Sequence, residues 1–331
     1  MRPTTCLSSG SGRESTSTSS LLGYISVISE ASPVEKVIAP PAAPEVLVED
    51  AGKAAQNLCW DDRDESLWWT DFGSGRLFRL NLSTRIPSAV YEGPNVSAFI
   101  PQEDGSWLLF REKDIAQLSF GRHEQVVPLL ENLRFDGDRF SEAIADETGR
   151  VLVGTMRNGR PNGAGLYRLE TDGTLAKIVG GTGQSAGLGW NEKGDALYWT
   201  CGTTRTICRF RYDSKRGSAT NRQVFHECPP EEGVPTAMAV DMEGTLWSAR
   251  RESGAILKIA ADRRLRGQVT FPAPNVTSLV FGGRDHRTVF ASVVTAEGGS
   301  KIYSFQSPVA GMPLRRARIE GRVPTPTKAS P

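Results

Sequence analysis

One short segment of the chain combines a cation and a carboxylate that could act on the same small molecule. Arg139 and Glu142 lie in the segment RFSEA, 139–143. A guanidinium can hold a carboxylate or a developing oxyanion through two parallel hydrogen bonds. A carboxyl group can act as a general base once burial raises its pKa. Each residue also has a structural interpretation: Arg139 could pair with Glu142 or Asp138, and Glu142 could orient Arg139 or face the protein interior.

Two other kinds of catalytic site are weakly supported. The segment 183–187 matches the pattern G-x-S-x-G, in which Ser185 would be a nucleophile. That pattern works where a strand leads into a helix, but the following residues, LGWNEKG, are typical of a strand. A serine nucleophile also needs a histidine nearby, and His286 is expected at the opposite end of its strand. The chain has three histidines and five cysteines and no C-x-x-C pair, so a zinc site is hard to assemble.

Composition excludes several classes of partner. The chain has 39 Lys+Arg and 38 Asp+Glu, a formal charge of +1, so no overall field favours nucleic acid. The basic run at 263–266 lacks interleaved aromatic residues and is expected to be a solvated face. No apolar run of about 18 residues could span a membrane. Scattered cysteines suit a reducing compartment, so we predict a cytoplasmic protein with no evident partner protein.

Both ends of the chain differ from the rest. Residues 1–44 are rich in Ser, Thr, Gly and Pro, and we predict a disordered tail there and a second one at 323–331. The stretch 21–28 could instead be a weak signal-peptide core, and a mis-set start codon would also explain this segment.

A repeat organises the chain between these tails. Six times, a β-prone segment, a polar turn and a second β-prone segment follow one another, and a third apolar-alternating segment comes after them. The first apolar residue after each turn recurs roughly every 40–50 residues, the period of a β-propeller blade. These six residues are Leu67, Trp107, Val151, Leu197, Leu246 and Val289. We therefore predict an all-β fold, one six-bladed β-propeller over 45–322, closed by pairing of 45–48 with the last blade.

The first strand of each blade should line the central channel, where equivalent residues of the six blades converge. Those residues are Gln56, Ser97, Ser141, Ala186, Thr236 and Ser278. None carries a charge. Ca²⁺ and Mg²⁺ need several oxygen ligands including carboxylates, and zinc needs His, Cys or carboxylate. The axis is therefore predicted to be a poor site for a divalent metal.

The region 45–305 resembles the gluconolactonase, regucalcin and luciferin-regenerating-enzyme family of six-bladed propellers. The similar segments include GRVLVGTM (149–156), GLGWNEKGDALYWT (187–200) and VDMEGTLWSAR (240–250). The resemblance implies a metal-dependent lactone hydrolase. Its metal would be held by a Glu in the first blade, an Asn in an N-G-L turn and an Asp in a P-D-G turn, with an Arg and an Asn of R-F-N-D-G near the substrate.

This chain departs from the family pattern at each metal ligand. Gln56 replaces the Glu, Ala186 the Asn and Thr236 the Asp, while Arg139 is kept and Ser141 replaces the Asn of R-F-N-D-G. We therefore expect no metal and no other cofactor. Carbonyl polarisation would then have to come from hydrogen-bond donors and fixed charges.

Further residues could complete the site. Neutral donors and acceptors suited to a small polar or anionic ligand are offered by Gln56, Ser141, Thr236, Thr277 and Ser278. Cys201 stands where the family usually has an Asp; it could be a reactive thiol if Arg205 lowers its pKa, or a small buried residue. Arg250 and the residues after it could add positive charge at the channel mouth, or form a solvated loop.

The resulting hypothesis is a lactone hydrolase that works without a metal, with Arg139 as electrostatic stabiliser and Glu142 as base. An isomerase or cyclase that uses the same groups for proton transfer is a close variant. A propeller that binds a small ligand without catalysis, in a regulatory role, is the competing class.

Overall fold

The computed structural model describes residues 43–157 and 162–320, which belong to one compact unit. We predicted disordered tails at 1–44 and 323–331 and a possible signal core at 21–28. Apart from residues 43 and 44, these segments lie outside the described residues. In the described ranges, no helix has the length and apolar character that crossing a membrane requires.

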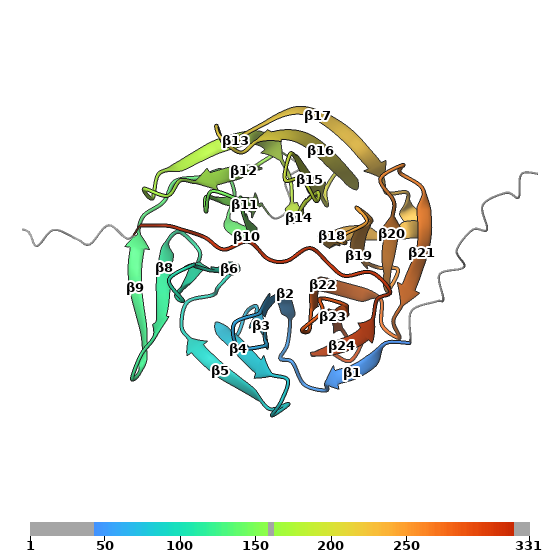
Figure 1. The fold of residues 1–331 in the computed structure, drawn as a ribbon, viewed down its shortest axis with the longest axis horizontal. Coiled ribbons are helices and arrows are strands. Elements are labelled where there is room, and N and C mark those ends of the chain that lie inside the picture. Colours follow the sequence, from blue (N-terminus) through green and yellow to red (C-terminus); the bar gives the residue numbers. More distant parts are fainter. Residues whose placement is uncertain (1–42, 158–161, 321–331) are drawn as a thin grey trace, which may run out of the picture. The chain divides into compact units, whose positions relative to one another are not determined.

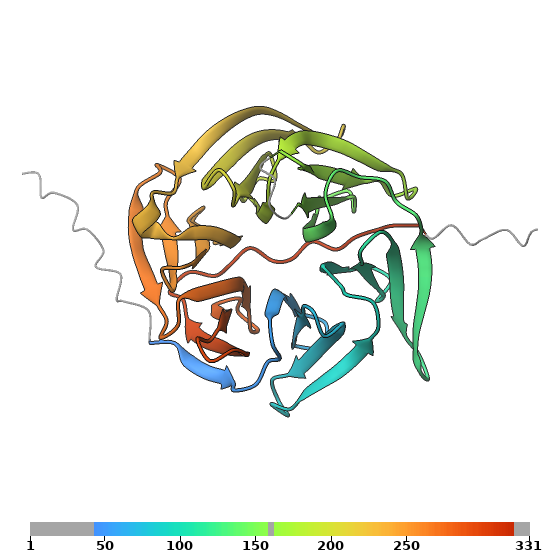
Figure 2. The same cartoon turned by 180° about the vertical axis from the view of Figure 1, so that it is seen from behind.

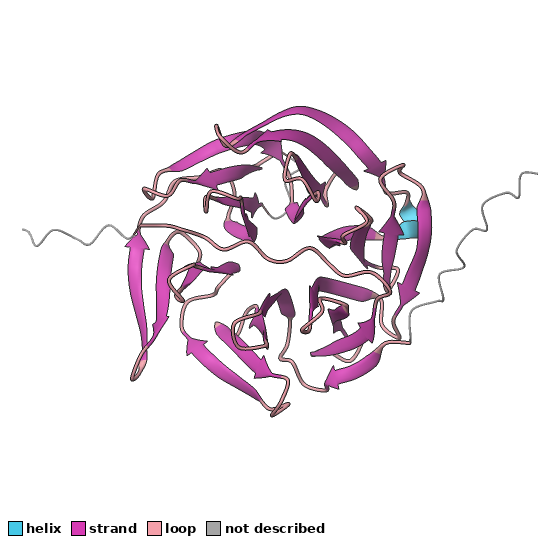
Figure 3. Ribbon diagram, viewed as in Figure 1, coloured by secondary structure: helices cyan, strands magenta, loops and turns pink. Residues whose placement is uncertain are grey.

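The described residues form six antiparallel sheets of four strands each, arranged as the blades of a propeller (Figures 1 and 3). The innermost strands of the blades are β2 (Ala55–Asp61), β6 (Ala98–Pro101), β10 (Arg139–Ala145), β14 (Ser185–Trp190), β18 (Val234–Val240) and β22 (Asn275–Gly282). The second strands are β3 (Ser66–Asp71), β7 (Trp107–Phe110), β11 (Val151–Met156), β15 (Ala196–Cys201), β19 (Leu246–Arg251) and β23 (Thr288–Val294).

Two further strands complete each blade. The third strands are β4 (Arg76–Asn81), β8 (Ile115–Phe120), β12 (Ala164–Leu169), β16 (Thr206–Asp213), β20 (Ala255–Ile259) and β24 (Ser300–Gln306). The outer strands are β5 (Pro87–Glu92), β9 (Glu124–Leu130), β13 (Leu175–Thr182), β17 (Ser218–Glu227), β21 (Leu265–Thr270) and β1 (Glu45–Val48). A single 3₁₀ turn, η1 (Pro230–Glu232), is the helical element of the described residues.

Burial along each strand follows from its place in the blade. Every residue of β3 and β15 is buried, because neighbouring blades cover both faces of the inner strands. The outer strand β9 is exposed over five of its seven residues. The tryptophans Trp60, Trp69, Trp107, Trp190 and Trp247 are all buried, so they pack in the core.

The six predicted blades and the predicted ring closure are both present. The N-terminal strand β1 pairs with β24, with Glu45 opposite Ser304 and Val46 opposite Tyr303. This pairing lets the first described strand complete the last blade and covers the free edge of β24 (Figure 1).

The first strands of five blades carry an irregularity near their beginning. The pairing register between first and second strand shifts after Gln56, Phe140, Ser185, Pro235 and Val276. A bulge leaves an extra residue without a direct partner and re-aims the side chains beside it. In this propeller the bulges lie at the end of the channel where the first strands start, which we call the mouth.

The chain after the last blade runs across the other end of the channel. The segment 307–320, which we call the crossing segment, passes over the ring between opposite blades (Figures 1 and 2). Its backbone bonds to the last residues of two first strands: Met312 N donates to Val240 O at 2.9 Å, and Ala317 N donates to Pro101 O at 2.9 Å. The last strand of the sixth blade ends at Gln306. We predicted that the propeller spans 45–322, but the crossing segment lies outside the blades and covers this end of the channel.

Candidate functional site

A polar cavity of about 220 Å³ opens at the mouth. We call it the mouth cavity. The first strands supply most of its wall, because their bulges lie at this end. Seven residues singled out in the sequence line it: Gln56, Arg139, Ser141, Glu142, Ala186, Thr236 and Thr277. The propeller thus brings together segments that lie more than two hundred residues apart in the sequence.

Arg139 begins β10 and faces this cavity with no carboxylate partner in the described part of the chain. Its guanidinium stacks over the ring of Phe72, 4.2 Å from the ring centroid, and Nη1 donates to Phe140 O at 3.3 Å. Burial lowers the pKa of Arg139 to about 10, so the group remains charged at neutral pH. The expected alternatives, a salt bridge to Glu142 or Asp138, are not formed among the described residues; Asp138 lies 3.4 Å from Arg157. Arg139 therefore keeps donors available to a ligand.

Glu142 follows Ser141 in the bulge of β10 and is the one carboxylate among the described residues that line the mouth cavity. Burial raises the pKa of Glu142 to about 8, against a hydrogen bond from the Leu188 backbone that favours the charged form. No described cation pairs with it. A carboxyl group with a pKa near the working pH is suited to proton transfer.

Hydroxyl groups at the mouth are engaged between neighbouring blades. Ser141 donates to the carbonyl of Ser185, Thr236 donates to Val276 O at 2.9 Å, and Thr277 donates to Ala55 O at 2.7 Å. In each case the acceptor lies on the first strand of the next blade. These three side chains therefore hold the ring together, and each hydroxyl has already used its proton.

The donors present at the mouth do not fit a divalent cation. Ca²⁺ prefers six to eight oxygen ligands with carboxylates among them. The cavity has one carboxylate, Glu142, against the two guanidinium groups of Arg139 and Arg251. Ala186 has no ligand atom in its side chain, and the Thr236 hydroxyl is bonded to backbone. The local charge favours an anionic ligand or a developing oxyanion.

Three of the predicted ligand-binding residues lie outside the mouth cavity. Ser278 lines a deeper cavity instead, where its hydroxyl accepts a hydrogen bond from Leu58 N at 2.9 Å. Cys201 is buried at the end of β15, opposite Ser185, and no described cation contacts its thiol. Arg250 is wholly buried in β19, where its Nη2 lies 3.4 Å from Glu232 Oε2.

The misplacement of Arg250 has a simple cause. Successive side chains of a strand point to opposite faces, so an error of one residue reverses the side. Arg250 and Arg251 both lie within β19, at a place where we had allowed for a loop. Of the two, it is Arg251 that lines the mouth cavity.

Two neutral side chains at the mouth were missed in the sequence. Asn57 adopts a positive φ of 54°, a conformation that Asn tolerates better than most residues, and its Nδ2 donates to Ser97 O at 2.6 Å. Its place next to Gln56 was the available signal. Gln184 also lines the cavity, and no sequence pattern distinguishes it.

Ser185 is arranged as a structural residue. Its side chain is buried, and its hydroxyl accepts a hydrogen bond from Trp199 Nε1 at 2.6 Å. The residues that follow it continue as β14 and form no helix. This geometry lacks the strand-to-helix turn that exposes a serine nucleophile.

One group of described residues could hold a metal ion, away from the mouth cavity. Ligand atoms of His226, Cys228 and Glu232 lie within 4.8 Å of one another, a grouping that sequence spacing had not indicated. The Glu232 carboxylate is already engaged: His226 Nε2 lies 2.8 Å from it and Arg250 Nη2 lies 3.4 Å from it. A fixed guanidinium at this distance opposes a second positive charge.

A family model described as the SMP-30/Gluconolactonase/LRE-like region matches residues 55–295. Pentonolactonase XacC from Haloferax volcanii is 31% identical over 253 residues, covering 76% of this chain and 85% of that protein.

Solved structures share the fold. A luciferin-regenerating enzyme superposes with a TM-score of 0.76 at 20% identity, covering 85% of this chain and 100% of its own. A calcium-binding protein, regucalcin, from Agrobacterium tumefaciens superposes with a TM-score of 0.77 at 18% identity, covering 85% of this chain and 98% of its own.

Proposed function

Since the chain belongs to the SMP-30/Gluconolactonase/LRE-like family, we propose that it hydrolyses a small lactone in the mouth cavity without a divalent metal. The family and the pentonolactonase among its relatives support a lactone as the substrate class. The residues at the mouth support a mechanism built on side chains alone.

One observation carries this proposal: Arg139 and Glu142 line the same cavity, and neither has a described partner of opposite charge. In a site that excludes water, a fixed cation stabilises developing negative charge more strongly than it does in bulk solvent. The raised pKa of Glu142 makes its carboxylate a stronger base than an exposed carboxylate.

In the proposed hydrolysis, Glu142 acts as the base and Arg139 stabilises the oxyanion. The Glu142 carboxylate removes a proton from a water molecule as the water oxygen attacks the lactone carbonyl carbon. The carbonyl oxygen becomes negatively charged, and the Arg139 guanidinium stabilises it. When the carbonyl re-forms, the ring C–O bond breaks and the alkoxide takes the proton from Glu142. The product is an open-chain hydroxy acid, whose carboxyl proton passes to solvent.

Two features favour this route over one that uses a metal. The positions where relatives are expected to place ligands hold Gln56, Ala186 and Thr236. The Thr236 hydroxyl donates to backbone carbonyls, and the two nearby guanidinium groups would repel a dication.

A lactone panel with and without EDTA tests the proposal. We expect turnover of at least one lactone that EDTA leaves unchanged and that metal addition does not raise. Turnover abolished by EDTA and restored by a divalent ion would overturn the metal-free mechanism. Binding without ring opening would identify a ligand-binding propeller, and a rearranged product without water uptake would identify an isomerase or cyclase.

A further inference from the structure

A second cavity lies behind the mouth cavity, inside the channel. Its volume is about 140 Å³, and it shares Asn57 and Glu142 with the mouth cavity. We call it the channel cavity. A molecule whose reacting group lies near Glu142 could therefore extend from the polar mouth into this space.

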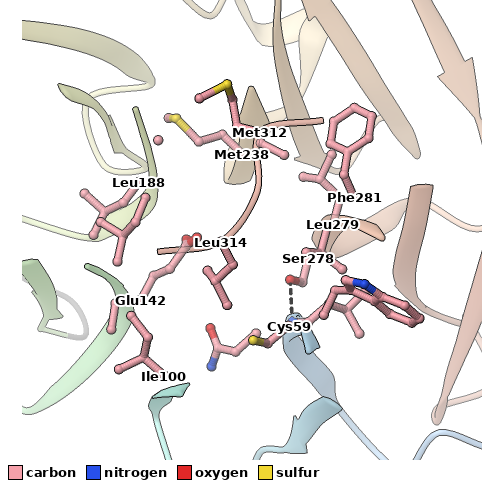
Figure 4. Close-up of a pocket in the computed structure, with 18 of the residues that line it drawn as sticks. Cys59, Ile100, Glu142, Leu188, Met238, Ser278, Leu279, Phe281, Met312 and Leu314 are labelled. Atoms are coloured by element: carbon pink, nitrogen blue, oxygen red, sulfur yellow. Dashed lines mark hydrogen bonds between the residues drawn. The ribbon is translucent and has the colours of Figure 1, made fainter. Parts of the chain in front are cut away.

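Apolar side chains make up most of the wall of the channel cavity, and its polar side chains include Asn57, Glu142, Ser278, His286 and Arg315. Figure 4 shows side chains from the first strands of several blades facing a common space, among them Ile100, Leu188, Met238 and Leu279. The hydroxyl of Ser278 accepts a hydrogen bond from Leu58 N at 2.9 Å. The apolar part of this wall gains free energy when it buries apolar surface of a ligand.

The crossing segment closes the far end of this cavity. Met312 and Leu314 extend from it toward the space between the blades (Figure 4). The segment is firmly seated: Gly311 N donates to His286 O at 2.8 Å, and a Cβ at Gly311 would lie 2.0 Å from the ring of Phe281. The channel cavity thus borders the mouth cavity at Asn57 and Glu142, and the crossing segment, with Met312, Leu314 and Arg315, lines its other end.

We propose that the substrate is a lactone with an apolar substituent, and that the channel cavity binds this substituent while the ester lies between Arg139 and Glu142. This inference rests on the proposed hydrolase function. Burial of apolar surface supplies the binding free energy, and the Glu142 carboxyl marks the boundary between the two parts of the site.

The size of the cavity sets the size of the substituent. An apolar cavity of roughly 150 Å³ in another protein takes up benzene. The channel cavity, about 140 Å³, is therefore suited to a short alkyl chain or a single aromatic ring.

The test compares γ-lactones whose alkyl chain grows from methyl to pentyl, from γ-valerolactone to γ-nonalactone, together with a sugar lactone. We expect kcat/KM to rise about two- to fourfold per methylene, and to exceed the value for the sugar lactone. A flat or falling series, or preference for the sugar lactone, would overturn the inference while leaving the hydrolase function intact.

A pair of variants locates the effect. Leu314→Trp fills the channel cavity from the crossing segment, and should lower kcat/KM for γ-nonalactone about tenfold or more while changing that for γ-valerolactone less than about threefold. Leu265→Trp is the control, because Leu265 is exposed on β21. If Leu314→Trp lowers kcat/KM equally for both lactones, the channel cavity does not bind the alkyl chain. The same holds if Leu265→Trp lowers kcat/KM selectively for γ-nonalactone.

Binding of 5-alkyl-2-pyrrolidinones, the γ-lactam analogues, separates this inference from the hydrolase proposal. We expect their Kd, measured by calorimetry, to fall with chain length in the unsubstituted protein and to stop falling in Leu314→Trp. If this pattern appears but no lactone is opened, the channel inference stands and the hydrolase function fails. If chain length has no effect on Kd, the channel inference fails.

Discussion

The Thr236 hydroxyl lies 2.9 Å from the carbonyl oxygen of Val276 on the next blade, and it donates a hydrogen bond there. The residue therefore joins two blades at the place where the family resemblance leads one to expect a metal-binding Asp. Thr277 makes the same kind of contact from the sixth blade to the first, at 2.7 Å from Ala55 O. The mouth of this propeller is held together by hydroxyl-to-backbone bonds.

Restoring carboxylates at the mouth should create a cation site. The variant Gln56→Glu/Ala186→Asn/Thr236→Asp adds two carboxylates and an amide oxygen beside Glu142, a donor set that suits Ca²⁺ or another divalent ion. We expect calorimetry to detect one bound ion in this variant and none in the unsubstituted protein. Stoichiometric binding to the unsubstituted protein would contradict our interpretation of the mouth.

A matched variant controls for the loss of the Thr236 hydrogen bond. Thr236→Val removes the bond to Val276 without adding charge, and should lower the free energy of unfolding by about 1 kcal/mol. It should gain no cation binding. Any cation affinity in Thr236→Val would have to come from other residues.

Replacing Glu142 should remove the proposed base. Glu142→Gln keeps the shape of the side chain but cannot accept the proton, so kcat should fall by about 10²- to 10⁴-fold. Glu142→Asp should retain part of the activity. If Glu142→Gln hydrolyses lactones at an unchanged rate, Glu142 does not act as the base.

Activity should depend on pH through two groups at the mouth. Burial raises the pKa of Glu142 to about 8 and lowers that of Arg139 to about 10. The active form needs an ionised Glu142 and a protonated Arg139, so kcat/KM, corrected for spontaneous hydrolysis, should rise through about pH 8 and fall above about pH 10. In Glu142→Gln the rising limb should vanish. An activity already constant from pH 6 to 8 in the unsubstituted protein would contradict this assignment.

Removing the Arg139 guanidinium should weaken ligand binding. Arg139→Ala should cost about 1.5–3 kcal/mol of affinity, because a hydrogen bond to a charged group is lost. Arg139→Lys should recover part of it, since the charge is kept but the planar fork is not. Arg266→Ala, on the exposed strand β21, is the control. Calorimetry with a lactam analogue measures the difference, and unchanged affinity in Arg139→Ala would remove Arg139 from the mechanism.

The crossing segment should contribute to stability through Arg316. Its Nη2 lies 2.7 Å from the buried Asp61 carboxylate. Burial alone would raise the pKa of Asp61, but hydrogen bonds from Arg316 and Arg63 outweigh it and hold the pKa below its usual value. We expect Arg316→Met to lower the free energy of unfolding by about 1–3 kcal/mol at neutral pH.

The stabilisation that Arg316 provides should depend on pH. A lowered pKa in the folded state stabilises the protein above the ordinary pKa of Asp61, and this contribution is lost as pH falls through the lowered value. The difference between Arg316→Met and the unsubstituted protein should therefore shrink in acid. Arg318→Met is the matched control: its partner Glu103 is half exposed, so its loss should cost at most about 1 kcal/mol. Equal losses in both variants would contradict a specific role for Arg316.

The repeat pattern was enough to predict the blades. Leu67, Val151 and Leu246 each lie on the second strand of a blade, as their recurrence indicated. Alternating apolar residues and polar turns are local properties, and they recur because every blade buries its strands in the same way. The pairing of residues 45–48 with the last blade followed from the need to cover an edge.

The candidate site was predictable only in part. The sequence indicated Arg139 and Glu142 as candidates, because their chemistry suits a small polar ligand and because Arg139 is kept where the family has R-F-N-D-G; both line the mouth cavity. It did not distinguish Arg250 from Arg251, because the side of a strand that a residue occupies depends on where the strand ends and where its bulges lie.

What the sequence alone determined is therefore the repeat, the closed ring and the neutral residues at the mouth. Tertiary structure decided three further features: which hydroxyl groups donate hydrogen bonds to neighbouring blades, that Glu142 borders two cavities, and that the crossing segment closes the far end of the channel. The physical reason is distance along the chain. Met312 and Glu142 belong to one site only because closure of the ring brings remote segments together, and no local pattern encodes that contact.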